Sequence, residues 1–233
     1  MKTSAMIFAA GLGTRLYPLT ENKPKALVEY KGMTLLERAI RKVTEFGIRQ
    51  IVINVHHFGE QILDFVENHS FDADIIISDE RENLLDTAGG LKWAEAHFAN
   101  SEQILLYNVD IISNINLQKL IETHQRSEAM VTLAVRNRET ARYFIFDKNT
   151  MQLCGWTNIQ TGEKKEVFTI ENSELLAFSG IHCVNKSILN KIPVGEKCSF
   201  TPLYLQLANS EKILGYLHQE DDWMDVGKVE YYR

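Results

Sequence analysis

Short apolar segments rich in β-branched residues recur along the first half of the chain. Segments of this kind, which lack an alternation of polar and apolar positions, are typical of strands that are buried on both faces of a sheet. They predict strands at residues 5–10, 51–55, 75–78, 104–109 and 131–135.

Between these segments the apolar residues recur at helical spacing. Residues 35–46 carry apolar side chains at intervals of three and four, and Gly47 then supplies a stop signal. Similar spacing appears around residues 62–66 and 117–121. Strands that alternate with helices need crossover connections, so we predict an α/β fold with a mainly parallel sheet.

The pattern changes after residue 135. Segments 143–147, 153–158 and 166–170 follow one another without helical spacing, and they predict an antiparallel excursion at about 137–175. A further strand is expected at 175–184 and a helix at 201–209, with Thr201 as its cap and Pro202 in its first turn. A last strand ends at His218. With no visible linker or repeat, we predict a single domain spanning 1–233.

Composition narrows the class of partner. The net charge of -6 argues against a surface that binds nucleic acid or an anionic membrane. Cys154, Cys183 and Cys198 are odd in number and form no CxxC pair, so they predict neither a disulfide framework nor a zinc site. The N-terminal apolar run is too short for a secretory leader, and no segment approaches membrane-spanning length. We therefore expect a cytoplasmic protein.

The first predicted strand ends in an unusual turn, within the stretch AMIFAAGLGTRLYP. Gly11 and Gly13 allow the backbone to approach a ligand closely, and successive amide N–H groups in such a turn attract anions. Arg15 adds a guanidinium suited to phosphate oxygens, and Lys23 and Lys25 follow within NKPKAL. This segment is basic within an acidic protein, which suits a triphosphate.

The turn does not fit the common nucleotide motifs. Leu16 stands where a dinucleotide fingerprint has its third glycine, and no GK[ST] follows as in a phosphate-binding P-loop. The missing glycine argues against an oxidoreductase that uses a nicotinamide cofactor.

The longer stretch AAGLGTRLYPLTENKPKAL resembles the signature of the sugar-1-phosphate nucleotidyltransferases, GxGTRxxPLT followed by PKxL. This resemblance implies a Rossmann-like three-layer sandwich with a mixed, mainly parallel sheet, and an enzyme that joins a nucleoside triphosphate to a sugar 1-phosphate and releases pyrophosphate. It also implies that Ala10, Gly11, Gly13, Thr14 and Arg15 line the triphosphate, and that Lys25 contacts the phosphates at the reacting centre.

Three more segments carry the resemblance. DTAGG at 86–90 is similar to the family element that holds base and ribose, which implies roles for Thr87, Gly89 and Gly90, with Thr87 also able to cap a helix. Asp110 ends the strand in YNVD, and Asp225 lies in WMDVG. The family pattern implies that these two aspartates bind Mg²⁺, a cation that prefers oxygen ligands.

One position in these segments departs from the family. Val109 stands directly before Asp110, where family members usually have glycine. It favours an alternative from another class, a catalytically weak sensor that binds sugar nucleotides.

The sugar and the base are less sharply indicated. The chain lacks the EKP element of many thymidylyl- and guanylyltransferases, and its FSGI strand and WxDVG ending look most like the N-acetylmuramate-1-phosphate uridylyltransferases. Mannose-1-phosphate guanylyltransferase is the close alternative. Ser179 and Gly180 are predicted to lie near the sugar, whereas Arg142 and Trp156 are either lid contacts or structural residues. The oligomeric state stays open.

Overall fold

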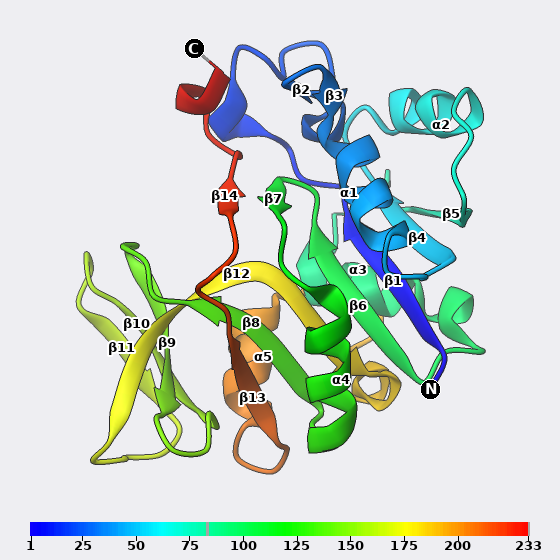
Figure 1. Cartoon of the computed structure of the whole chain (residues 1–233). Coiled ribbons are helices and arrows are strands. Elements are labelled where there is room, and N and C mark those ends of the chain that lie inside the picture. Colours follow the sequence, from blue (N-terminus) through cyan, green and yellow to red (C-terminus); the bar gives the residue numbers. More distant parts are fainter. Residues whose placement is uncertain (83, 233) are drawn as a thin grey trace.

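A mixed sheet forms the centre of the protein in a computed structural model, which describes residues 1–82 and 84–232 (Figure 1). Its strand order is β11-β10-β9-β12-β6-β1-β4-β5, and β8, paired with β12, carries β13 on its other edge. The strands of this sheet are β1 (Thr3–Phe8), β4 (Gln50–Val55), β5 (Asp74–Asp79), β6 (Gln103–Asn108), β8 (Val131–Arg136), β9 (Arg142–Asp147), β10 (Leu153–Asn158), β11 (Glu163–Glu166), β12 (Ser173–Asn185) and β13 (Ile213–Leu217).

The half of the sheet built from β6, β1, β4 and β5 is parallel throughout. Each of these strands lies where an apolar segment predicts one. Side chains on both faces of β1, β4 and β6 are buried, whereas the edge strand β5 is mostly half-buried. β1 ends at Phe8 rather than at Ala10, and the Ala9 N–H instead donates to Oδ1 of Asn54 at 2.8 Å. The chain therefore leaves the sheet just before the glycine turn.

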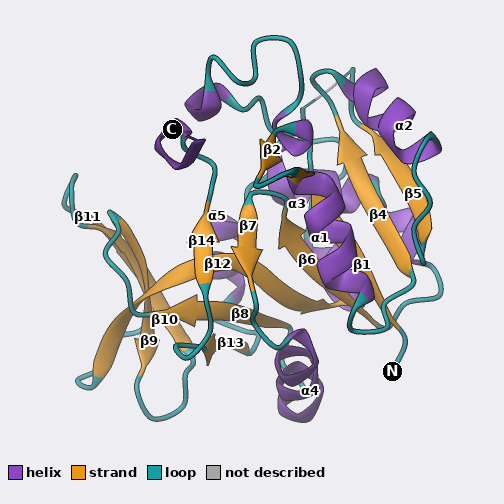
Figure 2. Cartoon of the chain, turned by 45° about the horizontal axis from the view of Figure 1, so that its top comes forward, coloured by secondary structure: helices purple, strands orange, loops and turns teal. Residues whose placement is uncertain are grey.

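Helices cover both faces of the sheet, which confirms the predicted three-layer α/β architecture (Figure 2). One apolar cluster joins one face of the sheet to α1, α2 and α4, and the other joins the opposite face to α3 and α5. The helices are α1 (Leu35–Thr44), α2 (Gly59–Glu67), α3 (Asp86–Trp93), α4 (Leu117–Ser127) and α5 (Phe200–Leu207).

Side chains explain where two of the helices begin. The Thr34 hydroxyl accepts a hydrogen bond from the Glu37 N–H at the start of α1, and Asn116 caps α4 in the same way. Two predicted caps are wrong. Helix α5 begins at Phe200 after Ser199, so Thr201 lies inside its first turn, and α3 begins at Asp86, so Thr87 is already helical.

The other half of the sheet is largely antiparallel. The first residues of β12 pair with β9, and the rest of the strand pairs with β6 and β8, so this single long strand joins the two halves. Strands β9, β10 and β11 form the predicted excursion. The third of them lies at Glu163–Glu166 and not at 166–170, because the chain turns directly after Asn158 and its exposed EKKE strand has no apolar face to mark it.

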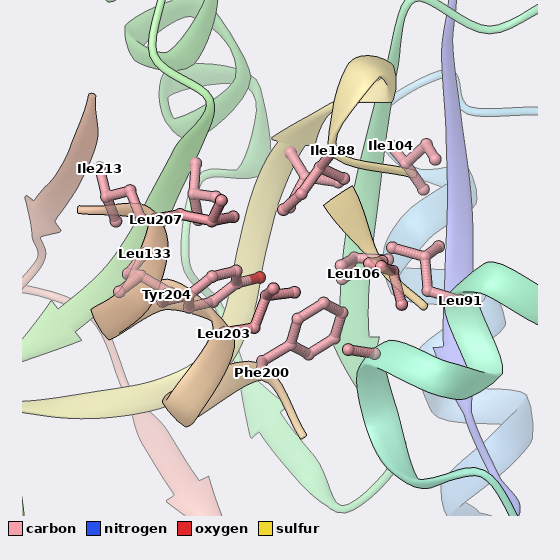
Figure 3. Packing of buried hydrophobic residues seen from close by; sticks show 14 of the residues in the cluster. Leu91, Ile104, Leu106, Leu133, Ile188, Phe200, Leu203, Tyr204, Leu207 and Ile213 are labelled. Carbon is pink, nitrogen blue, oxygen red and sulfur yellow. The ribbon is translucent and has the colours of Figure 1, made fainter. Parts of the chain in front are cut away.

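The packing of α5 shows how the second face of the sheet is sealed (Figure 3). The rings of Phe200 and Tyr204 are stacked at 5.1 Å between centroids, and Phe8 meets Phe200 edge to face at 6.0 Å. Each fully buried side chain of this size stabilises the fold by roughly 1.5–3 kcal/mol. Phe8, the last residue of β1, thus fixes the start of the glycine turn against the core.

Two short ribbons complete the described structure. β2 (Glu29–Tyr30) pairs with β3 (Met33–Thr34), and β7 (Ile111–Ser113) pairs with β14 (Trp223–Asp225). Among residues 1–82 and 84–232, no helix has the length and apolar character needed to cross a bilayer.

Candidate active site

The glycine turn after β1 folds back over the segment that carries Lys25. Gly13 has a left-handed backbone with φ of 68°, and a Cβ there would lie 2.9 Å from Thr20 Cγ2 and 3.2 Å from Lys25 Cβ. The Thr20 hydroxyl donates to the Gly13 carbonyl at 2.9 Å. Glycine is therefore required at position 13 by both its conformation and the close approach, and the turn brings the two basic segments together.

Lys25 and Asp110 form the centre of the site. Lys25 begins a short 3₁₀ turn after Pro24, and its Nζ donates to Asp110 Oδ2 at 2.8 Å. Asp110 follows β6, and its side chain is only 6% exposed. Arg15 Nη2 lies 3.7 Å from the same carboxylate oxygen, although most of the Arg15 side chain is exposed. A buried carboxylate is thus matched by two cations.

Val109 does not disturb this arrangement. Its side chain is buried in the cluster beneath α1 and α4, and its backbone lies outside the left-handed region. Because no special conformation is needed directly before Asp110, valine fits where a glycine is usual.

Asp225 reaches the same point from the far end of the chain. It ends β14, which pairs with β7 so that Asp225 lies opposite Ile111, and the Val226 N–H donates to the Asp110 carbonyl at 3.0 Å. The two aspartates meet over Gly227. A Cβ at Gly227 would lie 2.5 Å from Asp110 Oδ2 and 2.9 Å from Asp225 Oδ1.

The two carboxylates beside Gly227 are a donor set that suits a divalent cation. The two carboxylate oxygens are separated by no more than the sum of those two distances, and Mg²⁺ binds oxygen ligands at about 2.0–2.1 Å while keeping several waters. Arg15 Nη2 also lies 3.0 Å from the same Cβ position. Gly227, whose role the motif reading missed, therefore leaves the room in which carboxylates and a guanidinium converge.

A cleft of about 380 Å³ opens beside this centre. Six of the predicted residues line it, namely Ala10, Gly11, Arg15, Lys25, Thr87 and Asp110. Gly13, Thr14 and Lys23 lie outside its lining, and Thr14 and Lys23 are exposed. The cleft thus runs from the glycine turn and its cations to the start of α3.

Gly89 and Gly90 serve packing and are not among the lining residues of the cleft, so their contact with the nucleotide stays a prediction. A Cβ at Gly89 would lie 2.7 Å from the Glu196 carbonyl oxygen, and one at Gly90 would lie 2.5 Å from Glu80 Oε1. Both glycines are buried in α3. Their missing side chains admit a backbone segment on one side and the carboxyl of Glu80 on the other.

Glu80 is a cleft residue that the motifs did not reveal. It is 3% exposed, and its Oε1 accepts a hydrogen bond from Asn54 Nδ2 at 2.8 Å. Burial raises the pKa of this carboxyl, against the opposing effects of hydrogen bonds from the Asn54 side chain and the Leu85 backbone. Glu80 directly follows β5, and a polar residue at the carboxyl end of a parallel strand was the available signal.

A second cleft, of about 830 Å³, lies on the other side of Arg15. Arg15 lines both clefts, and Asp225 and Trp223 of β14 line the second. Neither Arg142 nor Trp156 is part of its lining. Arg142 is exposed, whereas Trp156 packs partly buried against the core cluster of α3 and α5, so a structural role is supported for Trp156 alone.

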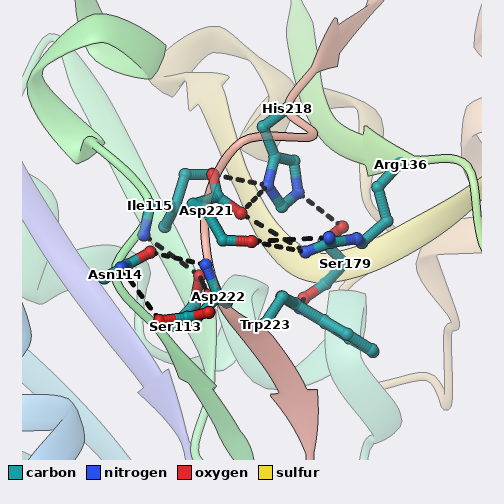
Figure 4. A network of polar contacts seen from close by, with 9 residues as sticks. All are labelled: Ser113, Asn114, Ile115, Arg136, Ser179, His218, Asp221, Asp222 and Trp223. Atoms are coloured by element: carbon teal, nitrogen blue, oxygen red, sulfur yellow. Dashed lines mark hydrogen bonds and ion pairs between the residues drawn. The ribbon is translucent and has the colours of Figure 1, made fainter.

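A polar network beneath β14 explains why Ser179 is not at a surface (Figure 4). The Ser179 hydroxyl donates to His218 Nε2 at 2.7 Å, and His218 Nδ1–H donates to Asp221. Ser179 is fully buried, and serine, histidine and carboxylate stand in series. Its carbonyl accepts from Trp223 and its hydroxyl contacts His218, so the sugar contact of Ser179 stays a prediction.

Gly180 also serves packing. Its φ is 76°, and a Cβ there would lie 2.6 Å from Ile111 Cγ1 and 3.1 Å from Asn108 Nδ2. It lies at an irregularity in the pairing of β12 with β8, between Phe178 and His182. Gly180 therefore allows a close approach between β12 and the residues around Asp110, and its sugar contact stays a prediction.

Comparisons with known proteins agree with this geometry. The sequence model of the family described as Nucleotidyl transferase matches residues 4–233. The chain is 29% identical over 236 aligned residues to N-acetylmuramate alpha-1-phosphate uridylyltransferase of Caulobacter vibrioides, covering 96% of this chain and 91% of that protein. It is 28% identical to the catalytic subunit beta of mannose-1-phosphate guanylyltransferase of Drosophila melanogaster, covering 97% of this chain but only 60% of that protein.

Solved structures share the fold at lower identity. HddC from Yersinia pseudotuberculosis has a TM-score of 0.79 at 19% identity, covering 100% of this chain and 96% of that one. UDP-glucose pyrophosphorylase from Acinetobacter baumanii has a TM-score of 0.79 at 17% identity, covering 100% and 91%. The family match spans almost the whole chain and the described fold, so this protein is an enzyme of the nucleotidyl transferase family, and its resemblance to the sugar-1-phosphate nucleotidyltransferases is confirmed.

Proposed function

We propose that this enzyme transfers a uridylyl group from UTP to N-acetylmuramate 1-phosphate, giving the UDP-sugar and pyrophosphate. The observation that carries the proposal is the convergence of Lys25, Asp110, Asp225 and Arg15 where the two clefts meet. A nucleotide in the first cleft and a sugar 1-phosphate in the second would bring their phosphates to this point. Positioning and electrostatic stabilisation then account for most of the catalysis.

Mg²⁺ is the proposed cofactor, held by Asp110 and Asp225. When bound there, the ion supplies positive charge to the reacting phosphates and orients them. The residues of the chain do the remaining work. Lys25, anchored by Asp110, donates to the α-phosphate, and Arg15 donates to the departing pyrophosphate.

The glycine turn is the proposed binding site of the triphosphate. Backbone N–H groups around Ala10, Gly11, Gly13 and Thr14 follow a parallel strand, the position at which α/β sheets present anion-binding turns. Thr87 faces the opposite end of the same cleft, where the ribose and base would lie.

Mannose-1-phosphate guanylyltransferase is the second candidate. A relative of that activity aligns with nearly the whole chain. The uridylyltransferase is preferred because the relative with that activity matches this chain along 91% of its own length, against 60% for the guanylyltransferase subunit.

The proposed compartment is the cytosol, because its reducing environment suits the free cysteines Cys154, Cys183 and Cys198.

The test is a matrix of UTP, GTP, CTP and dTTP against N-acetylmuramate, mannose, glucose and N-acetylglucosamine 1-phosphates, scored by pyrophosphate release. UTP with N-acetylmuramate 1-phosphate should have the highest kcat/KM. Asp110→Asn should abolish the release while leaving the melting temperature near that of the wild type. A best pair of GTP with mannose 1-phosphate would replace the first candidate by the second. Tight nucleotide binding with no turnover on any pair would identify a sensor.

A further inference from the structure

Arg138 holds a fixed position in the wall of the second cleft. It follows β8, and its guanidinium carbon lies 4.5 Å from the centroid of the Trp223 ring. Its Nη2 donates to the Phe178 carbonyl at 3.1 Å. A guanidinium stacked on an indole and tethered to a backbone oxygen loses little further freedom when it binds a ligand.

The charge of Arg138 is not matched within the described structure. Arg136, two residues earlier, pairs with Asp221 at 3.3 Å, whereas no carboxylate of residues 1–82 and 84–232 lies within 4.0 Å of Arg138. Burial lowers the pKa of Arg138, and the more distant Asp225 only partly offsets this effect. A partly desolvated cation without a counterion is unfavourable, so the binding of an anionic ligand beside Arg138 would be energetically favourable.

Terminal Nη–H donors of Arg138 are free to receive that ligand, whereas its Nε–H is buried. A guanidinium has five N–H groups in a planar fork. Apart from the bond to Phe178, the described contacts include only a long one of 3.5 Å from Nη1 to the Glu139 carbonyl. The remaining donors suit a carboxylate, whose two oxygens match the fork.

The reacting phosphate already has its own partners. In the proposed function it lies at the meeting point of the clefts, beside Lys25, Arg15 and the aspartate pair. Arg138 belongs instead to the part of the second cleft formed by Trp223, Tyr143 and Tyr231, where the sugar ring would lie. We infer that Arg138 binds a carboxylate carried by the sugar and makes the second cleft selective for acidic sugar 1-phosphates.

This inference rests on the proposed function and is tested by a chemical double-mutant cycle. The substrates are N-acetylmuramate 1-phosphate and its derivative in which the lactyl carboxylate is a carboxamide, and the proteins are the wild type and Arg138→Met. Wild-type kcat/KM should be about 10- to 100-fold higher for the acid, the range expected for a lost hydrogen-bonded charge. In Arg138→Met the two substrates should be used equally, at the wild-type rate for the amide.

Retained activity on the amide shows that Arg138→Met is folded, and Arg142→Met is the matched control because Arg142 is a nearby exposed cation outside the cleft. This control should keep the wild-type preference for the acid. A preference that survives in Arg138→Met overturns the inference while the proposed function stands. An equal loss on both substrates also overturns it, since Arg138 would then act on the shared phosphate. A wild type that prefers mannose 1-phosphate overturns both proposals.

Discussion

Gly227→Ala is the sharpest test of the proposed metal site, because it fills the space between the ligands without removing any of them. The new Cβ would lie 2.5 Å from Asp110 Oδ2, whereas 3.4 Å or more is ordinary van der Waals contact. Asp225 Oδ1 at 2.9 Å and Arg15 Nη2 at 3.0 Å crowd the same atom. One or both carboxylates must therefore move by close to 1 Å, a displacement that can lower turnover about 10²-fold.

The assay is pyrophosphate release as a function of Mg²⁺ concentration. We expect kcat/KM to fall about 10²-fold and the half-activating Mg²⁺ concentration to rise, with little change in melting temperature, since Gly227 lies outside the helices and strands. Gly59→Ala is the matched control: Gly59 also lacks a left-handed backbone, and its nearest neighbours are the flexible side-chain atoms of Arg81. Wild-type kinetics and metal response in Gly227→Ala would refute the convergence of ligands at this point.

Three further predictions follow from the same structure. Lys25→Ala should lower kcat at saturating substrates by about 10²–10³-fold, as for other preorganised donors to a developing charge, and near wild-type turnover would remove its assigned role. Asp225→Asn should raise the half-activating Mg²⁺ concentration, measured by titrating activity with metal. Loss of a residue that only supports a metal ligand lowers metal affinity about 10- to 100-fold, so loss of a ligand should cost at least as much. An unchanged midpoint contradicts the ligand assignment. Burial lowers the pKa of His182 to about 3. Between about pH 6.5 and 3 this histidine therefore binds a proton in the unfolded chain but not in the folded protein, and the free energy of unfolding falls as the pH drops through this window. Residue 182 lies among aromatic rings, so His182→Phe should fold. Between pH 7 and 4.5 its free energy of unfolding in urea should fall by roughly 2 kcal/mol less than that of the wild type, and an equal fall would be evidence against His182 as the cause of the pH dependence.

The parallel half of the fold was predictable because burial on both faces leaves a continuous apolar signal in each strand. The edge strand β11 carried no such signal, since all four residues of EKKE are exposed. The glycine turn, Lys25, Asp110 and Asp225 were found because their motifs are local and long. Their contacts confirm that residues far apart in sequence meet at one point, while their catalytic roles stay predictions.

Glycines in the motifs have packing roles that the sequence alone did not reveal. Gly89, Gly90 and Gly180 all lie in motifs that suggested a substrate surface, yet each is buried where another part of the chain would clash with a Cβ. Glycine marks a close approach, but the sequence does not say whether the approaching group is a ligand or the protein itself. Glu80 illustrates the same ambiguity, since its carboxyl occupies the space beside Gly90 and also lines the cleft.

The network of Ser179, His218 and Asp221 was not revealed by the sequence, because Ser179 lies in β12 and its two partners follow β13. Its effect on the site follows from what it holds. The Trp223 indole N–H donates to the Ser179 carbonyl at 2.8 Å, and Trp223 begins the three-residue strand whose last residue is Asp225. Burial lowers the pKa of His218 and favours its neutral form, which can accept from Ser179 while donating to Asp221. Short strands have few ladder hydrogen bonds of their own, so the position of the Asp225 carboxylate depends on this buried network as much as on the pairing of β14 with β7.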